Sequence, residues 1–132
     1  MQPANLDAET GLGVAYVNEY TSGIGQNAGG PPKGVTILLD VVGKDPNNIG
    51  ANFNLGMFAV TSRQYDKAAA RFKTVIEHSP KPGFEPWFYL AECYRQLGLK
   101  PEAITAYQKS RDLMPDTVID KRIDEYIKEL KN

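Results

Sequence analysis

Apolar residues recur along the chain with the spacing of helical stripes. The segments "NFNLGMFAV" (52–60) and "WFYLAECYR" (87–95) place apolar residues three or four positions apart, which is the spacing of one face of an α-helix. A second helical pattern follows each segment, over 65–80 and 100–115, and both of these patterns end in a proline. The chain is therefore predicted to form helical hairpins.

The same order of residues returns at a fixed distance. A fainter copy, over 9–17 and 32–46, precedes the two clear ones. A period of roughly 20–50 residues indicates repeats that stack on one another. Equivalent positions in the three copies lie 34 and then 35 residues apart: Gly34, Ala68 and Ala103; Leu38, Phe72 and Tyr107; and Pro46, Pro80 and Pro115.

The first copy has a longer link between its two helical segments. Tyr16 lies 18 residues before Gly34, whereas Tyr94 lies nine residues before Ala103. The stretch "SGIGQNAGGPPKG" (22–34) is therefore predicted to contain a nine-residue insertion in the turn of the first hairpin. It does not fit a phosphate-binding loop, because two prolines stand where that motif needs a lysine directly after its second glycine. We expect a spacer, with a docking loop as the alternative.

These spacings and residues resemble the tetratricopeptide repeat, a 34-residue helix-turn-helix unit. The third copy carries most of its signature positions: Trp87, Leu90, Ala91, Tyr94, Ala103, Tyr107, Ser110 and Pro115. The second copy matches at Leu55, Gly56, Ala68, Phe72 and Pro80, and the first at Leu12, Gly13, Tyr16, Leu38 and Pro46.

The resemblance implies an all-α fold, a right-handed superhelix of three hairpins closed by a capping helix. As one domain over 1–132, it would hold repeat one at 6–48 with the insertion at about 21–33, repeat two at 49–82, repeat three at 84–117 and the capping helix at 118–131. In the capping helix, Ile119, Ile123, Ile127 and Leu130 form one apolar stripe, and Thr117 with Asp120 offers an N-terminal cap.

The second helices are predicted to carry the other half of the interface within each hairpin. Gly56 and Ala68 let the two helices of a hairpin approach closely, and a large side chain at either position is expected to overpack the crossing. Arg63 departs from the family pattern, because it stands where Gly98 turns the next repeat. The remaining expected core residues are Phe72, Val75, Ile76, Ala103, Ile104, Tyr107 and Leu113.

The opposite faces of the first helices line a concave groove in stacked repeats of this kind, so a partner is expected there. Phe53, Met57, Val60, Phe88 and Tyr89 would form an apolar patch in its middle. In the alternative interpretation, the insertion or a neighbouring chain covers these side chains and they are core. The full set of candidate groove residues is Val14, Val17, Asn18, Phe53, Asn54, Met57, Val60, Phe88, Tyr89, Glu92 and Arg95. Some family members bind acidic chaperone tails through a clamp of Lys, Asn and Arg, and of that clamp only Asn54 is present, which disfavours such a partner.

Composition narrows the function classes. The net charge is -1 and no long basic run occurs, so nucleic acid is not an expected partner. No apolar run approaches the roughly 20 residues that cross a bilayer, and we expect a cytoplasmic protein with no membrane contact by this segment, although the chain could be a piece of a longer anchored or exported protein. Cys93 is the only cysteine and is expected to be a buried spacer, while His78, the only histidine, is expected near the exposed end of its helix. No catalytic site, metal site or cofactor is expected.

The sequence thus favours a non-enzymatic scaffold that binds a protein or peptide with apolar anchors. Two alternatives stay open. One is self-association through the repeat ends, which would give a homo-oligomer. The other, less favoured, is a regulator that responds to phosphate or nucleotide through the glycine-rich stretch.

Overall fold

The computed structural model describes residues 33–115 and 121–132, and these residues are entirely helical apart from their turns. The expectations for Val14, Val17, Asn18, the insertion and the start of the capping helix lie outside the described residues. The helices are α2 (Lys33–Lys44), α3 (Ile49–Thr61), α4 (Tyr65–His78), α5 (Phe84–Gln96), α6 (Lys100–Leu113) and α7 (Lys121–Lys131).

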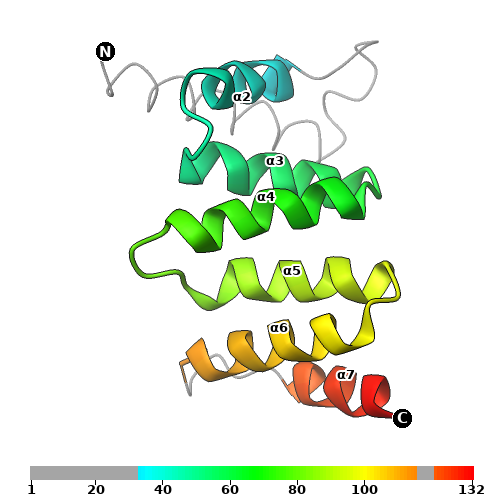
Figure 1. Ribbon diagram of the computed structural model, residues 1–132. Coiled ribbons are helices and arrows are strands. Elements are labelled where there is room, and N and C mark those ends of the chain that lie inside the picture. Colours follow the sequence, from blue (N-terminus) through cyan, green and yellow to red (C-terminus); the bar gives the residue numbers. More distant parts are fainter. Residues whose placement is uncertain (1–32, 116–120) are drawn as a thin grey trace.

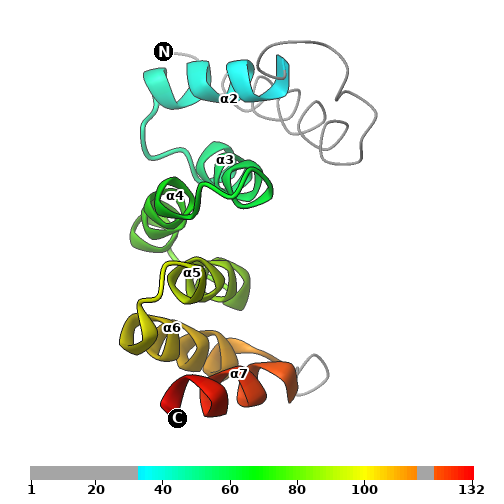
Figure 2. The same ribbon diagram turned by 90° about the vertical axis from the view of Figure 1, so that its right-hand side faces the viewer.

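The helices form a stack in chain order. Within the described parts of the chain, each helix packs chiefly on the helix before it and the helix after it, from α2 at one end to α7 at the other (Figure 1). Figure 2 shows two layers, with α3 and α5 in one and α4 and α6 in the other. This all-α arrangement of sequential helix pairs confirms the predicted fold class.

In the hairpin of α3 and α4, Gly56 packs directly against the ring of Phe72. A Cβ atom added to Gly56 would lie 2.9 Å from two ring atoms of Phe72, and Phe72 itself is completely buried. Only glycine therefore fits at this crossing without a shift of the ring. This contact confirms the role expected for Gly56.

The turns within the two complete hairpins have the same hydrogen bonds. The amide of Gln64 donates to the carbonyl of Ala59, as the amide of Leu99 donates to that of Tyr94, at 2.8 and 2.9 Å. This geometry places the residue before each of them in the left-handed region, with φ of 59° at Arg63 and 77° at Gly98. The α3–α4 turn therefore keeps the shape of the α5–α6 turn although it has an arginine at this position. The positive φ of Arg63 costs about 1–2 kcal/mol of conformational free energy that a glycine would not lose.

The apolar core consists of two clusters. The larger one joins α3 to α7 and includes Phe72, Leu90, Tyr107 and Ile123, all buried. The smaller one joins α2 to α3 through five buried residues: Val35, Leu38, Val41, Ala51 and Leu55.

The expectation that Leu113 belongs to the core is wrong, because its side chain is 46% exposed. The buried stripe of α6 runs through Tyr107 and Ser110, and the half-buried Met114 continues it. Leu113 lies beside that stripe at the end of its helix. Position in the last turn therefore leaves this leucine in solvent.

Asn52 stands at the repeat position that Trp87 occupies in the next repeat, 35 residues later. Asn52 is buried, and its side chain donates to the carbonyls of Pro46 and Asn48 at 2.9 and 2.8 Å. Its Oδ1 accepts a hydrogen bond from Arg71 at 3.1 Å. These bonds satisfy the buried amide and attach the preceding turn to α3 and α4.

Candidate functional site

The described candidate residues lie on two helices of one layer. Four are on α3 and four on α5, and every one of them is half-buried: Phe53, Asn54, Met57 and Val60, and Phe88, Tyr89, Glu92 and Arg95. The three earlier candidates, on residues 14–18, lie outside the described residues. The apolar members of this set form the aromatic patch: Phe53, Met57, Val60, Phe88 and Tyr89.

Ring contacts make the aromatic patch continuous from α3 to α5. The ring centroids of Phe53 and Tyr89 are 6.0 Å apart, and those of Tyr89 and Phe88 are 5.4 Å apart, both in edge-to-face geometry. This is a favoured arrangement for aromatic pairs. The sequence therefore brings together three rings that lie up to 36 residues apart in the chain.

The same rings also contact the core. Phe53 lies edge-on to the buried Phe72 at 5.7 Å, and Tyr89 stacks on Phe72 at 5.7 Å. Phe88 reaches the buried ring of Tyr107 at 6.2 Å. Each ring of the aromatic patch is therefore partly packed against a buried ring of another helix and partly accessible. The observed burial is intermediate between the open groove and the covered core that the sequence left as alternatives.

Polar side chains border the aromatic patch on both of its helices, with Glu92 and Arg95 on α5 and Asn54 on α3. The carboxylate of Glu92 pairs with the guanidinium of Arg95 at 2.7 Å. The guanidinium carbon of Arg95 lies 4.2 Å from the ring centroid of Tyr126, so α7 holds this side chain in place. Asn54, on α3, uses its amide nitrogen to donate to the carbonyl of Gly50 at 2.8 Å.

Burial and charge shift the pKa values around this pair. Burial raises the pKa of the Tyr107 hydroxyl, and the negative charge of Glu92 raises it further. Burial lowers the pKa of Arg95, but the hydrogen bond to Glu92, together with electrostatic interactions with Tyr107, Glu92 and Tyr126, outweighs it and the pKa is raised overall. Tyr107 is therefore a neutral phenol and Arg95 a permanent cation at physiological pH.

Cys93 and His78 are the single cysteine and the single histidine of the sequence, and the structure describes both. Burial raises the pKa of the Cys93 thiol to about 12, so the thiol is protonated and unreactive at neutral pH. His78 is exposed at the end of α4, as the sequence predicted. In the part of the chain that the structure describes, no group of His, Cys, Asp and Glu could hold a metal ion. Across the same residues, no helix is long and apolar enough to span a bilayer.

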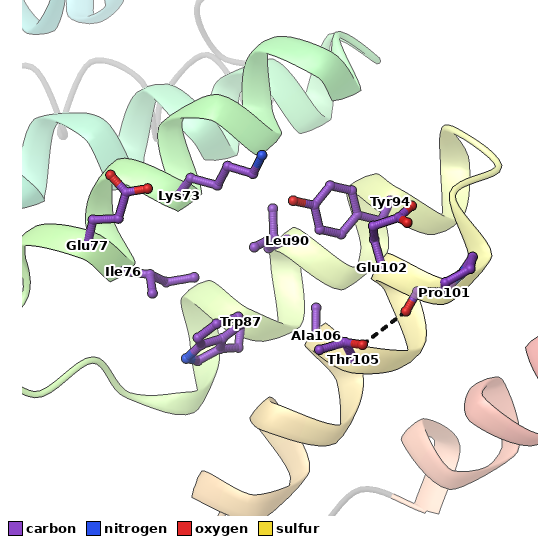
Figure 3. A pocket seen from close by; sticks show the side chains of 10 residues that line it. All are labelled: Lys73, Ile76, Glu77, Trp87, Leu90, Tyr94, Pro101, Glu102, Thr105 and Ala106. Carbon is purple, nitrogen blue, oxygen red and sulfur yellow. Dashed lines mark hydrogen bonds between the residues drawn. The ribbon is translucent and has the colours of Figure 1, made fainter.

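The sequence analysis missed a pocket on another side of α5. This α5 pocket has a volume of about 500 Å³ and lies between α4, α5 and α6 (Figure 3). Its lining residues are Lys73, Ile76, Glu77, Trp87, Leu90, Tyr94, Pro101, Glu102, Thr105 and Ala106. The repeat register marked Trp87, Leu90 and Tyr94 as family positions, but it gave no sign that a hollow would remain between two second helices.

Comparisons with known proteins agree with this architecture. A family model described as tetratricopeptide repeat matches residues 84–117. Two solved structures, a mutant of MamA and MamA MSR-1 C2, superpose with TM-scores of 0.74 and 0.73 at 25% and 24% sequence identity. Each alignment covers 95% of this chain, but only 65% and 64% of the respective MamA chains, so this chain spans slightly less than two thirds of their length. Among curated proteins no match was found.

Tetratricopeptide repeats are generally protein-interaction scaffolds, and they are typically not enzymes. The repeat spacing, the sequential helix pairs and the two kinds of match lead to one conclusion. This chain is a tetratricopeptide repeat protein.

Proposed function

We propose that the chain is a protein-interaction module that binds an extended or helical partner segment across the aromatic patch. The observation that supports this proposal is the continuous row of half-buried apolar side chains from α3 to α5, bordered by Asn54 on one helix and by Glu92 and Arg95 on the other. A few aromatic anchors can supply most of the free energy of binding at such a surface. The partner segment would insert apolar side chains between Phe53 and Phe88.

The rings are already positioned before a partner arrives. Phe53 and Tyr89 are both in contact with the buried ring of Phe72, so neither is free to turn away from the surface. Prepositioned anchors lose little conformational entropy on binding, which favours affinity. We therefore expect the shape of the binding surface to change little between the free and the bound state.

A peptide selection tests this proposal and needs no identified partner. The 132-residue chain is used to select peptides from a random library, and the selected peptides are titrated into isotope-labelled protein by nuclear magnetic resonance. We expect selected peptides with spaced apolar residues, and amide shifts concentrated in α3 and α5. Polar peptides, or shifts concentrated elsewhere, would refute the proposal.

Met57→Lys is the variant of choice, because the aliphatic part of lysine can keep the packing while its ammonium group points to solvent. Loss of an anchor contact is expected to weaken binding by about tenfold or more. Leu113→Lys is the matched control, since it makes the same kind of change at a leucine that is 46% exposed and lies outside the aromatic patch. Equal affinity of both variants would contradict the assignment of the site.

A further inference from the structure

The α5 pocket has an apolar interior and a charged rim. Leu90 and Ala106 are buried at its base, and Trp87 and Tyr94 stand at its two ends with Leu90 between them (Figure 3). The Thr105 hydroxyl already donates to the carbonyl of Pro101 at 3.1 Å, so it makes little demand on a ligand. An apolar side chain of a ligand would therefore fit the interior, and any polar recognition would come from the rim.

The rim has an excess of unpaired negative charge. Glu77 comes from α4 and Glu102 from α6, both are exposed, and neither has an ion-pair partner among the described residues. The one cation, Lys73, lies with its ammonium group 5.7 Å from the ring centroid of Tyr94 and points toward that ring (Figure 3). This contact shows that the Tyr94 face can receive a cation from the pocket side.

The charge of this rim is not a consequence of the repeat packing. One repeat earlier, between α2, α3 and α4, a pocket of about 470 Å³ occupies the equivalent place. Leu55 there corresponds to Leu90, and Lys67 corresponds to Glu102, 35 residues later. Stacking of the repeats thus produces a pocket in both places. Of these two pockets, only the α5 pocket has acidic residues at its rim.

We propose that the α5 pocket is a second binding site, separate from the aromatic patch, for a partner segment with an apolar side chain next to a lysine or arginine. The apolar side chain would lie on Leu90 between Trp87 and Tyr94. The adjacent cation would reach Glu102 or Glu77, which flank the pocket from opposite helices. Charge complementarity selects this partner over an acidic one, because two carboxylates and a single lysine line the rim.

Trp87 gives a direct measurement of this binding, because it is the only tryptophan of the chain. Three capped heptapeptides without aromatic residues serve as probes: one with leucine and lysine, one with leucine and glutamate, and one with serine and lysine. We expect a saturable change in Trp87 emission with the leucine–lysine peptide, binding of the leucine–glutamate peptide weaker by about tenfold, and no change with the serine–lysine peptide. Equal binding of the two leucine peptides, or no change in emission with any peptide, would overturn the proposal.

Two substitutions at the rim isolate the role of charge. Glu102→Gln should weaken binding of the leucine–lysine peptide by about two- to fivefold. Glu102→Lys should remove the preference for the leucine–lysine peptide over the leucine–glutamate peptide. The second variant is expected to fold, because Lys67 occupies the equivalent position of the preceding repeat. Glu129→Lys makes the same charge change at an exposed position of α7 and should leave peptide binding unchanged.

The test is independent of the function proposed for the aromatic patch. Met57→Lys should bind the leucine–lysine peptide as the unaltered chain does, since Met57 does not line the α5 pocket. If Met57→Lys removes the Trp87 response, the peptide binds at the aromatic patch and the proposal fails. If emission changes with protein concentration alone and light scattering shows a dimer, a second copy fills the pocket, which also overturns it.

Discussion

Gly56→Ala tests whether the α3–α4 crossing is as tight as the structure indicates. The added methyl carbon would lie 2.9 Å from Cε1 and Cζ of Phe72 and 3.2 Å from Cδ1. The two distances of 2.9 Å are shorter than real Cβ contacts, so the ring or the helix must move. Phe72 is fully buried, and its ring contacts both Phe53 and Tyr89, so a shift of the ring would disturb two further side chains.

Two opposing free-energy changes determine the magnitude. Overpacking of a core contact costs about 1–3 kcal/mol, and replacement of glycine by alanine within a helix contributes about 1 kcal/mol in the stabilising direction. Because the obstructing ring is fixed on two sides, we place the overpacking cost in the upper part of its range. The expected net effect is a loss of about 1–2 kcal/mol from the free energy of unfolding.

Urea unfolding followed by circular dichroism measures this loss. Gly43→Ala is the matched control, because a Cβ atom there meets nothing within 4 Å, and it should leave stability unchanged or raise it by up to about 1 kcal/mol. Phe72→Leu removes the ring atoms in question, so in that background Gly56→Ala should be neutral or stabilising by up to about 1 kcal/mol. If Gly56→Ala stabilises the chain, or costs the same with and without the Phe72 ring, the steric argument is wrong.

Two further predictions concern backbone strain and pH. Arg63→Gly should raise the free energy of unfolding, measured in urea, by about 0.5–1 kcal/mol, because glycine adopts the φ of 59° without strain. Gly98→Ala, at a φ of 77°, should lower it. A destabilised Arg63→Gly variant would refute the strain argument. Burial, with a smaller effect of Glu92, raises the pKa of Cys93 from 9.0 to about 12, so above pH 9 the unfolded chain loses the thiol proton while the folded chain keeps it. Stability should therefore fall between pH 9 and about 12, by up to about 1.4 kcal/mol per pH unit from this thiol, and Cys93→Ala should show a smaller fall in pH-dependent unfolding; an identical slope in both proteins would contradict the shift.

The fold could be predicted from the sequence because the residues that form its core recur at the repeat distance. Equivalent residues such as Phe72 and Tyr107 recur at the repeat distance, and each occupies the same buried place beside the preceding helix. The unusual turn at Arg63 was also visible, since its position in the register is that of Gly98. The division into repeats at 6–48, 49–82 and 84–117 stays a prediction.

The candidate site was less predictable, because surface properties depend on neighbours that periodicity does not specify. The helical pattern named Phe53 and Arg95 as residues of the groove, which stays a prediction, but it could not show that Phe72 and Tyr126 also contact them. The α5 pocket depends on how far apart α4 and α6 lie, and this distance follows from the packing of whole helices. No local motif encodes it.

The ring contacts of Phe53, Phe88 and Tyr89 restrict how partner selectivity can evolve in this chain. Exchange of any of these rings would alter the packing between helices as well as the binding surface, since Phe53 and Tyr89 contact the buried ring of Phe72 and Phe88 contacts that of Tyr107. Asn54 takes no part in these ring contacts, since its amide donates to Gly50 of its own helix, whereas Met57 and Val60 also pack against the core. Related chains with different partners are therefore expected to keep the rings and to diverge first at Asn54.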